Sequence, residues 1–244
     1  MSHFIKEYIK QIQSKFDTWG ATEHTYRITL ETLLLGLSSQ ITVTNEHERI
    51  VGVWMPDFTI KSKQDNTIPL GRIEAKDLHI SLDEKKNEDQ LKRYKDAFDN
   101  FIYTNYLTFI FYRNGKRIEI VQLWERTKSW IERKTDNLFD NNIIKLENLL
   151  REFLSFQGLT ITSPEKLAKA MAQKAQLIKF AIESIFEQWD SSNLELQYEA
   201  FKSLLVHDLT KAQFADMYSQ TVAYGLFSAR LYDPTLPTFS LEES

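Results

Sequence analysis

Residues 56–77 have the sequence PDFTIKSKQDNTIPLGRIEAKD. Residues 57–63 alternate between two sides, with Phe58 and Ile60 on one and Asp57, Thr59, Lys61 and Lys63 on the other, which predicts a strand with an apolar and a polar side. Residues 64–67 are turn formers, and residues 70–76 predict a second strand. Together these residues predict a β-hairpin. Residues 49–54 are rich in apolar and β-branched residues, which favours a further strand before it.

Helices and strands are predicted on both sides of this hairpin. Residues 25–37 place apolar side chains at helical spacing and predict a buried helix, and residues 84–101 predict another. Residues 106–112 and 117–123 flank Asn114-Gly115, a strong hairpin-turn signal because both residues tolerate positive φ. This order of elements predicts an α/β fold with a mixed sheet.

The chain changes character near residue 160. Beyond it all signals are helical: Ser163 can cap a helix, and Pro164 suits a first helical position. We therefore expect an α/β domain over residues 1–160 and an all-helical part over residues 161–244. Further helices in that part are expected over residues 194–206 and 211–231.

Composition and charge narrow the class of protein. The 244 residues include no cysteine, which excludes disulfide scaffolds, thiol catalysis and thiolate zinc sites. The formal net charge of −4 argues against a dedicated DNA-binding module, which is usually basic, but it agrees with a metal site built from carboxylates. Residues 1–15 predict an amphipathic helix rather than a signal peptide, and no stretch approaches the roughly 20 apolar residues that span a bilayer. We expect a cytoplasmic protein with no membrane partner.

Three polar residues of the hairpin are expected to lie close together. Glu74 and Lys76 are two residues apart on one strand, and Asp57 begins the strand that pairs with it, so one acid from each strand can converge on a single cation. Mg²⁺ prefers oxygen ligands from a few carboxylates and water, and a nearby lysine can orient an attacking water. These residues therefore favour metal-dependent hydrolysis of a phosphodiester. The alternative is two solvated acids and a lysine on an exposed sheet face.

Pro56-Asp57 followed by Glu74-Ala75-Lys76 resembles the PD-(D/E)xK nuclease superfamily. The resemblance implies a restriction-endonuclease-like mixed β-sheet core flanked by helices. It further implies that Asp57 and Glu74 hold one or two Mg²⁺ ions, which Mn²⁺ can replace, with the Ala75 carbonyl as an extra ligand. Lys76 would orient the attacking water.

Two helices supply further candidates through the same resemblance. Gln90 and Tyr94 match the Q-x-x-x-Y motif found in a subset of these nucleases, which implies that they border the site and hold DNA or order the metal shell. Tyr94 could equally be a core residue. Related nucleases often add an acid from the first buried helix, for which Glu23 is the first choice and Glu31 the second; Glu23 could instead simply favour the helix N-terminus.

Basic residues flank the predicted site. Lys61, Lys63 and Lys92 are candidates for contacts with DNA phosphates, each adding a salt-dependent increment of affinity. The alternative is that these lysines lie on the solvent-exposed faces of a strand and a helix, which would have the same composition without binding DNA.

Two longer segments resemble one particular group within this nuclease superfamily. Residues 20–27 (GATEHTYR), with the two motifs above, resemble the start of single-polypeptide restriction–modification enzymes of Type IIG and Type ISP. Residues 215–230 (ADMYSQTVAYGLFSAR) resemble the helical connector of the same enzymes. The resemblance implies that residues 1–160 are a nuclease domain and residues 161–244 a connector.

The same resemblance implies the partners of the chain. They are double-stranded DNA and the downstream adenine-N6 methyltransferase and target-recognition domains of one prokaryotic polypeptide, with a transient dimer on DNA left open. The chain contains neither a methyltransferase D/N-P-P-Y/F motif nor a phosphate-binding loop, so we expect a fragment that stops before the methyltransferase. A stand-alone repair-type nuclease and an inactive nuclease-like docking module are the alternatives.

Overall fold

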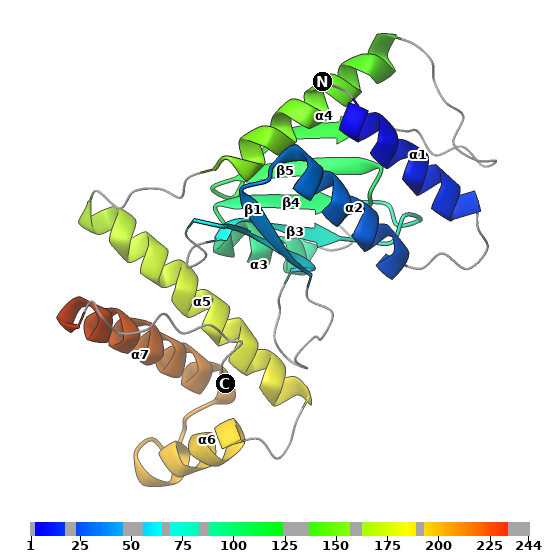
Figure 1. The fold of residues 1–244 in the computed structure, drawn as a ribbon. Helices are drawn as coiled ribbons and strands as arrows, with labels where there is room; N and C mark the ends of the chain where they lie inside the picture. The colour runs from blue at the N-terminus through cyan, green and yellow to red at the C-terminus, as the bar shows by residue number, and fades with distance from the viewer. Residues whose placement is uncertain are drawn as a thin grey trace. The chain divides into compact units, whose positions relative to one another are not determined.

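The computed structural model describes residues 3–17, 23–45, 56–64, 69–82, 88–123, 137–156, 163–188 and 193–233 (Figure 1). The chain forms two compact units. Unit 1 comprises Met1–His47 with Pro56–Gly158, and unit 2 comprises Glu48–Met55 with Leu159–Ser244. The strand expected over residues 49–54 lies outside the described residues.

Unit 1 is built on a mixed six-stranded sheet whose strands follow one another in chain order. Of the strand pairs that the structure describes, β3–β4 is parallel and the others are antiparallel. The strands are β1 Ile41–Asn45, β2 Phe58–Ser62, β3 Pro69–Ala75, β4 Asn100–Thr104, β5 Thr108–Arg113 and β6 Lys116–Gln122.

Both predicted hairpins are confirmed. In the first, Phe58 of β2 pairs with Ile73 of β3. In the second, β5 and β6 are joined at Asn114 and Gly115, whose φ angles of 52° and 76° are the positive values that this tight turn requires.

A helix lies between the two parallel strands in the chain, and it ends earlier than predicted. The helix expected over residues 84–101 is α3, Glu88–Ala97, and Phe101 lies in β4 instead. All five residues of β4 are buried, as a strand between two neighbours requires. The aromatic spacing of Tyr94, Phe98 and Phe101 suggested one long helix, but these rings meet because α3 packs against β4.

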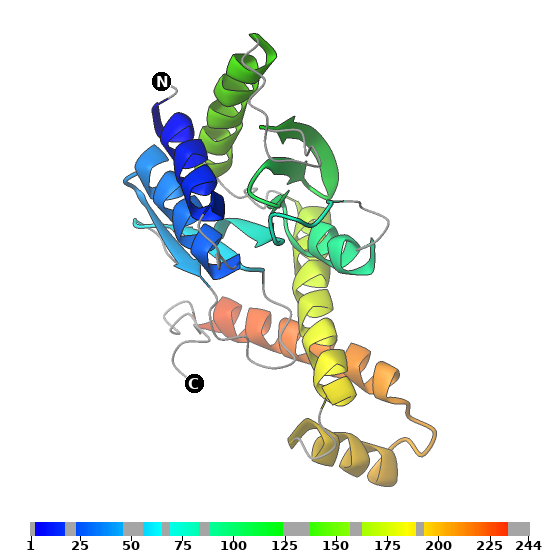
Figure 2. The same cartoon turned by 90° about the vertical axis from the view of Figure 1, so that its right-hand side faces the viewer.

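Helices cover both faces of this sheet (Figure 2). Helices α1 (His3–Asp17), α2 (Glu23–Leu37) and α4 (Asn137–Leu154) share one apolar core with the sheet, while α3 packs its aromatic side chains against the other face. The predicted α/β fold class, with a mixed sheet and flanking helices, is therefore confirmed.

The C-terminal end of α4 approaches β3 very closely. The side-chain amide of Asn100 donates hydrogen bonds to the carbonyl oxygens of Leu70 (2.7 Å) and Phe153 (2.9 Å), and it joins β3, β4 and α4. Gly71 lies against the Phe153 ring, where a larger residue would overlap it. This contact fixes the strand that carries Glu74.

The described part of unit 2 from residue 163 onward is helical. It contains α5 (Pro164–Gln188), α6 (Asn193–Leu204) and α7 (Lys211–Tyr232), as the sequence predicted. Phe214 is fully buried among aromatic side chains. Among the described residues, none of the helices has the length and apolarity needed to cross a membrane.

Candidate active site

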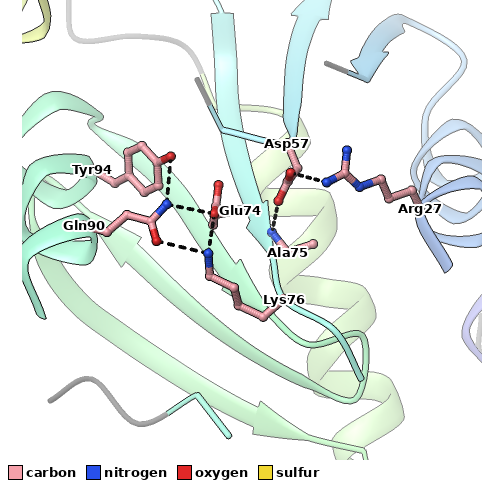
Figure 3. Close-up of polar contacts among 7 residues, drawn as sticks. All are labelled: Arg27, Asp57, Glu74, Ala75, Lys76, Gln90 and Tyr94. Atoms are coloured by element: carbon pink, nitrogen blue, oxygen red, sulfur yellow. Dashed lines mark hydrogen bonds and ion pairs between the residues drawn. The ribbon is translucent and has the colours of Figure 1, made fainter. Parts of the chain in front are cut away.

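Asp57 immediately precedes β2 and is almost completely buried, with 2% of its surface exposed. Its Oδ2 accepts a hydrogen bond from the backbone N–H of Ala75 (2.7 Å) on the neighbouring strand. Its Oδ1 accepts from Nη2 of Arg27 in α2 at 2.5 Å, which forms a buried ion pair (Figure 3). Both oxygens of the carboxylate are therefore held in fixed positions.

Glu74 lies near the end of β3 on the face that α3 covers, and it is 1% exposed. Its Oε1 accepts hydrogen bonds from Nζ of Lys76 (2.6 Å) and from the side-chain amide of Gln90 (3.1 Å). The Lys76 ammonium also donates to Oε1 of Gln90 (3.0 Å). The three side chains thus form a closed triangle of hydrogen bonds (Figure 3).

Parallel pairing explains how Gln90 comes to face Glu74. The chain must cross over the sheet to start β4 parallel to β3, and α3 is part of that crossover. Helix α3 therefore lies over the face from which Glu74 projects. Asp57 extends the β2–β3 register by one residue beyond the Phe58–Ile73 pair, which places it beside Glu74.

Tyr94 is a core residue whose hydroxyl contacts the site. Its ring packs against Phe98 and Phe101, and its hydroxyl accepts a hydrogen bond from Gln90 (3.3 Å). Burial, and then the negative charge of Glu74, raise the pKa of the Tyr94 phenol above its ordinary value. Tyr94 is 3% exposed and supports Gln90 through its hydroxyl, while its contact with DNA stays a prediction.

Two of the three predicted phosphate-binding lysines lie toward the end of β2 that is away from Asp57. Lys61 pairs with Pro69 at the far end of the β2–β3 hairpin from Asp57, and Lys63 follows the end of β2. Lys92 is exposed on α3. Of the predicted acids in α2, Glu31 is half-buried, and Glu23 begins the helix but its side chain lies outside the described part.

Arg27 is the site residue that sequence reasoning missed. Its side chain is 5% exposed and paired with Asp57. A signal was available, since Arg27 and Glu31 are the only charged residues in the apolar stretch 25–37. A buried cation in such a helix requires a partner.

The donor chemistry of the cluster fits magnesium. In proteins Mg²⁺ takes oxygen ligands from one or two carboxylates and leaves its other positions to water and substrate phosphates. Asp57 and Glu74 provide two carboxylates, and the Ala75 carbonyl lies between them in sequence. Within the described part of the chain there is no group of three or more acidic or histidine residues that could hold a metal, so a site here relies on two acids.

These features place the domain in the α/β class of proteins with a mixed sheet and a buried acidic–basic cluster at the end of a central hairpin. No protein-family model matches the chain, and no curated protein is significantly similar to it in sequence. Among solved structures it is similar to a chain of a cryo-EM structure of a DrdV–DNA complex. The identity is 20%, the match covers 64% of this chain and 99% of that chain, and the TM-score is 0.47.

Proposed function

We propose that this chain is the magnesium-dependent endonuclease module of a single-polypeptide restriction–modification enzyme. It would hydrolyse double-stranded DNA to 5′-phosphate and 3′-hydroxyl ends. The proposal rests mainly on two buried carboxylates of neighbouring chain segments. Asp57 accepts a hydrogen bond from the N–H of Ala75, the residue after Glu74, and Lys76 and Gln90 contact Glu74 directly.

The residues divide the work of hydrolysis. Asp57, Glu74 and the Ala75 carbonyl would hold the metal, which when bound polarises the phosphate and lowers the pKa of a coordinated water. Lys76 is the one basic member with appreciable exposure, 21% of its side chain, so it can reach the phosphate and orient the attacking water. The water oxygen bonds to phosphorus and the bond from phosphorus to O3′ breaks.

Gln90 would hold Glu74 and Lys76 in their relative positions. It donates to Glu74 and accepts from Lys76, so it fixes the carboxylate and the ammonium relative to each other. Tyr94 stays a neutral phenol because its pKa is raised, and its buried ring packs α3 against β4. Recognition of a particular DNA sequence would belong to other domains of the same polypeptide, which agrees with the net charge of −4.

Nicking of supercoiled plasmid in Mg²⁺ or Mn²⁺ tests the proposal. The wild type is compared with Asp57→Asn, Glu74→Gln and Lys76→Ala, and with Lys10→Ala as a control that removes an exposed lysine of the same unit. We expect a loss of about 100-fold or more in the first three variants and little change in the control. DNA binding is measured by gel shift in parallel.

Two results would contradict the proposal. Undiminished cleavage by Lys76→Ala and Asp57→Asn would mean that the hairpin residues are structural. A wild type that binds DNA but does not cleave it with either metal would indicate a docking module.

A further inference from the structure

We infer that Arg27 is a positioning residue that acts as an internal cation: it competes with the divalent metal for Asp57 and so weakens metal binding by the DNA-free protein. This inference rests on the proposed function, because it assumes that Asp57 is a metal ligand. It concerns a residue outside the nuclease motifs.

The first observation is the isolation of the Arg27 side chain from solvent. Only 5% of it is exposed, against 21% for Lys76, and it lies 2.5 Å from Oδ1 of Asp57. A guanidinium so deeply buried cannot contact DNA directly, so any effect of Arg27 on the chemistry is exerted through Asp57. Lys76, in contrast, has a path to a substrate.

The second observation is the charge balance of the cluster. Asp57 and Glu74 are each paired with a cation, Arg27 and Lys76 respectively. The formal charge of these four groups is therefore zero. A divalent cation that binds to the two carboxylates leaves a net charge of +2 in a largely buried place, and repulsion from the existing cations opposes its binding.

The third observation decides the direction of the effect. Loss of a group that orients a metal ligand ordinarily weakens metal binding. Here, however, the Asp57 carboxylate is also oriented by the Ala75 N–H, which donates to Oδ2 at 2.7 Å. The β2–β3 ladder fixes the backbone immediately beside it. Removing Arg27 therefore relieves charge repulsion while much of the orientation is retained.

The expected magnitude follows from Coulomb's law. Two cations on the two oxygens of one carboxylate lie about 5 Å apart, and even with the dielectric constant of water a unit charge at that distance weakens binding of a divalent ion by a factor of about ten. We therefore expect neutralisation of Arg27 to tighten metal binding about tenfold or more.

The test measures Mn²⁺ binding to the DNA-free protein by the electron paramagnetic resonance signal of free Mn²⁺. The variants are Arg27→Gln, which removes the charge, and Arg27→Lys, which keeps it. Arg151→Gln is the matched control: it removes one arginine of the same unit, whose contacts are with Glu147 and the Leu37 carbonyl. We expect tighter binding in Arg27→Gln alone.

The double variant Arg27→Gln/Asp57→Asn separates the two proposals. If the tightening disappears in the double variant, Asp57 is the ligand that Arg27 controls. If Arg27→Gln binds Mn²⁺ equally or more weakly than the wild type while Asp57→Asn still reduces binding, the role of Arg27 is refuted and the metal site stands. If Asp57→Asn changes binding in neither background, both proposals fail.

The stability of Arg27→Gln provides a second readout. In this variant without metal, the buried Asp57 has lost its Arg27 partner, so the melting temperature should fall. Mn²⁺ should raise the melting temperature of the variant by more than it raises that of the wild type. If the variant is unfolded without metal, Mn²⁺ should restore its circular dichroism spectrum. A variant that Mn²⁺ neither stabilises nor refolds would overturn the inference.

Discussion

Replacing Gly71 by alanine tests the packing that fixes the strand of Glu74. A Cβ at this position would overlap Cζ of Phe153, and it would lie 2.6 Å from Cε2 of the same ring and 2.8 Å from Nδ2 of Asn100. Neither neighbour can move outward, because Phe153 is 1% exposed and Asn100 is 4% exposed. The substitution must therefore displace α4 or break the hydrogen bonds of the Asn100 amide.

Two contributions set the size of the effect. Overpacking of a close-packed core costs about 1–3 kcal/mol. Disturbing the hydrogen bonds from Asn100 to the Leu70 and Phe153 carbonyls adds about 1 kcal/mol. We expect Gly71→Ala to lower the free energy of unfolding of unit 1 by about 2–4 kcal/mol, a large part of the stability of an ordinary domain.

Urea unfolding followed by circular dichroism gives the change in stability, and hydrogen exchange of β3 and α4 assigns it to unit 1. The control is Gly225→Ala in α7, where an added Cβ meets no atom within 4 Å and should stabilise the helix by about 0.5–1 kcal/mol. Adding Phe153→Leu to Gly71→Ala should recover part of the loss, because it removes ring atoms that clash. A Gly71→Ala protein within 0.5 kcal/mol of the wild type would show that α4 does not pack on β3 in this way.

Three further outcomes are expected. Burial, and then the coulombic interaction with Tyr106, raise the pKa of Tyr8 well above its ordinary value. The contribution of Tyr8 to stability is therefore full below about pH 10 and is lost at higher pH; unfolding measured against pH should show this alkaline decline, and Tyr8→Phe should reduce it. Thr210 caps α7 through a reciprocal pair of hydrogen bonds with Gln213, so Thr210→Ala should destabilise unit 2 by about 1 kcal/mol in thermal unfolding, and an unchanged melting curve would count against the cap. Gln90→Leu should reduce nicking about 10- to 100-fold, since it frees Lys76 from its position, and equal rates would show that Gln90 only packs.

The part of the fold that local pattern controls was predictable. Alternation of apolar and polar residues predicts which face each hairpin residue occupies, and it predicted that Glu74 and Lys76 lie on the same side. Lys76 follows the last residue of β3, and its ammonium contacts Glu74. Asn114-Gly115 predicted its turn because few other residues tolerate both φ angles. These signals need only neighbouring residues in the chain.

The errors arose where the outcome depends on distant parts of the chain. Phe101 continues a helical aromatic spacing, yet it belongs to β4 because that strand completes the parallel pair with β3. Strand β1 and helix α4 were not predicted.

Arg27 shows the same limit within the site. The family resemblance implied that the helix before the hairpin contributes a side chain to the site, and an acid was the expected type. Which residue of α2 faces Asp57 depends on how the helix packs across the sheet, and this follows from the whole core rather than from residues 23–37. The catalytic assignments of the remaining residues stay predictions until the variants are measured.

The parallel pairing of β3 with β4 also bears on how the site forms during folding. Glu74 and Gln90 are 16 residues apart in the chain, and the β3–α3–β4 segment that brings them together is continuous. Arg27 and Asp57 are 30 residues apart and meet only when α2 docks on the sheet. Closing the shorter loop costs less chain entropy, so the Glu74 half should form earlier than the Asp57 half. The cluster would then be completed when the Asp57 half forms, and this later half brings Arg27 as the partner of its own carboxylate.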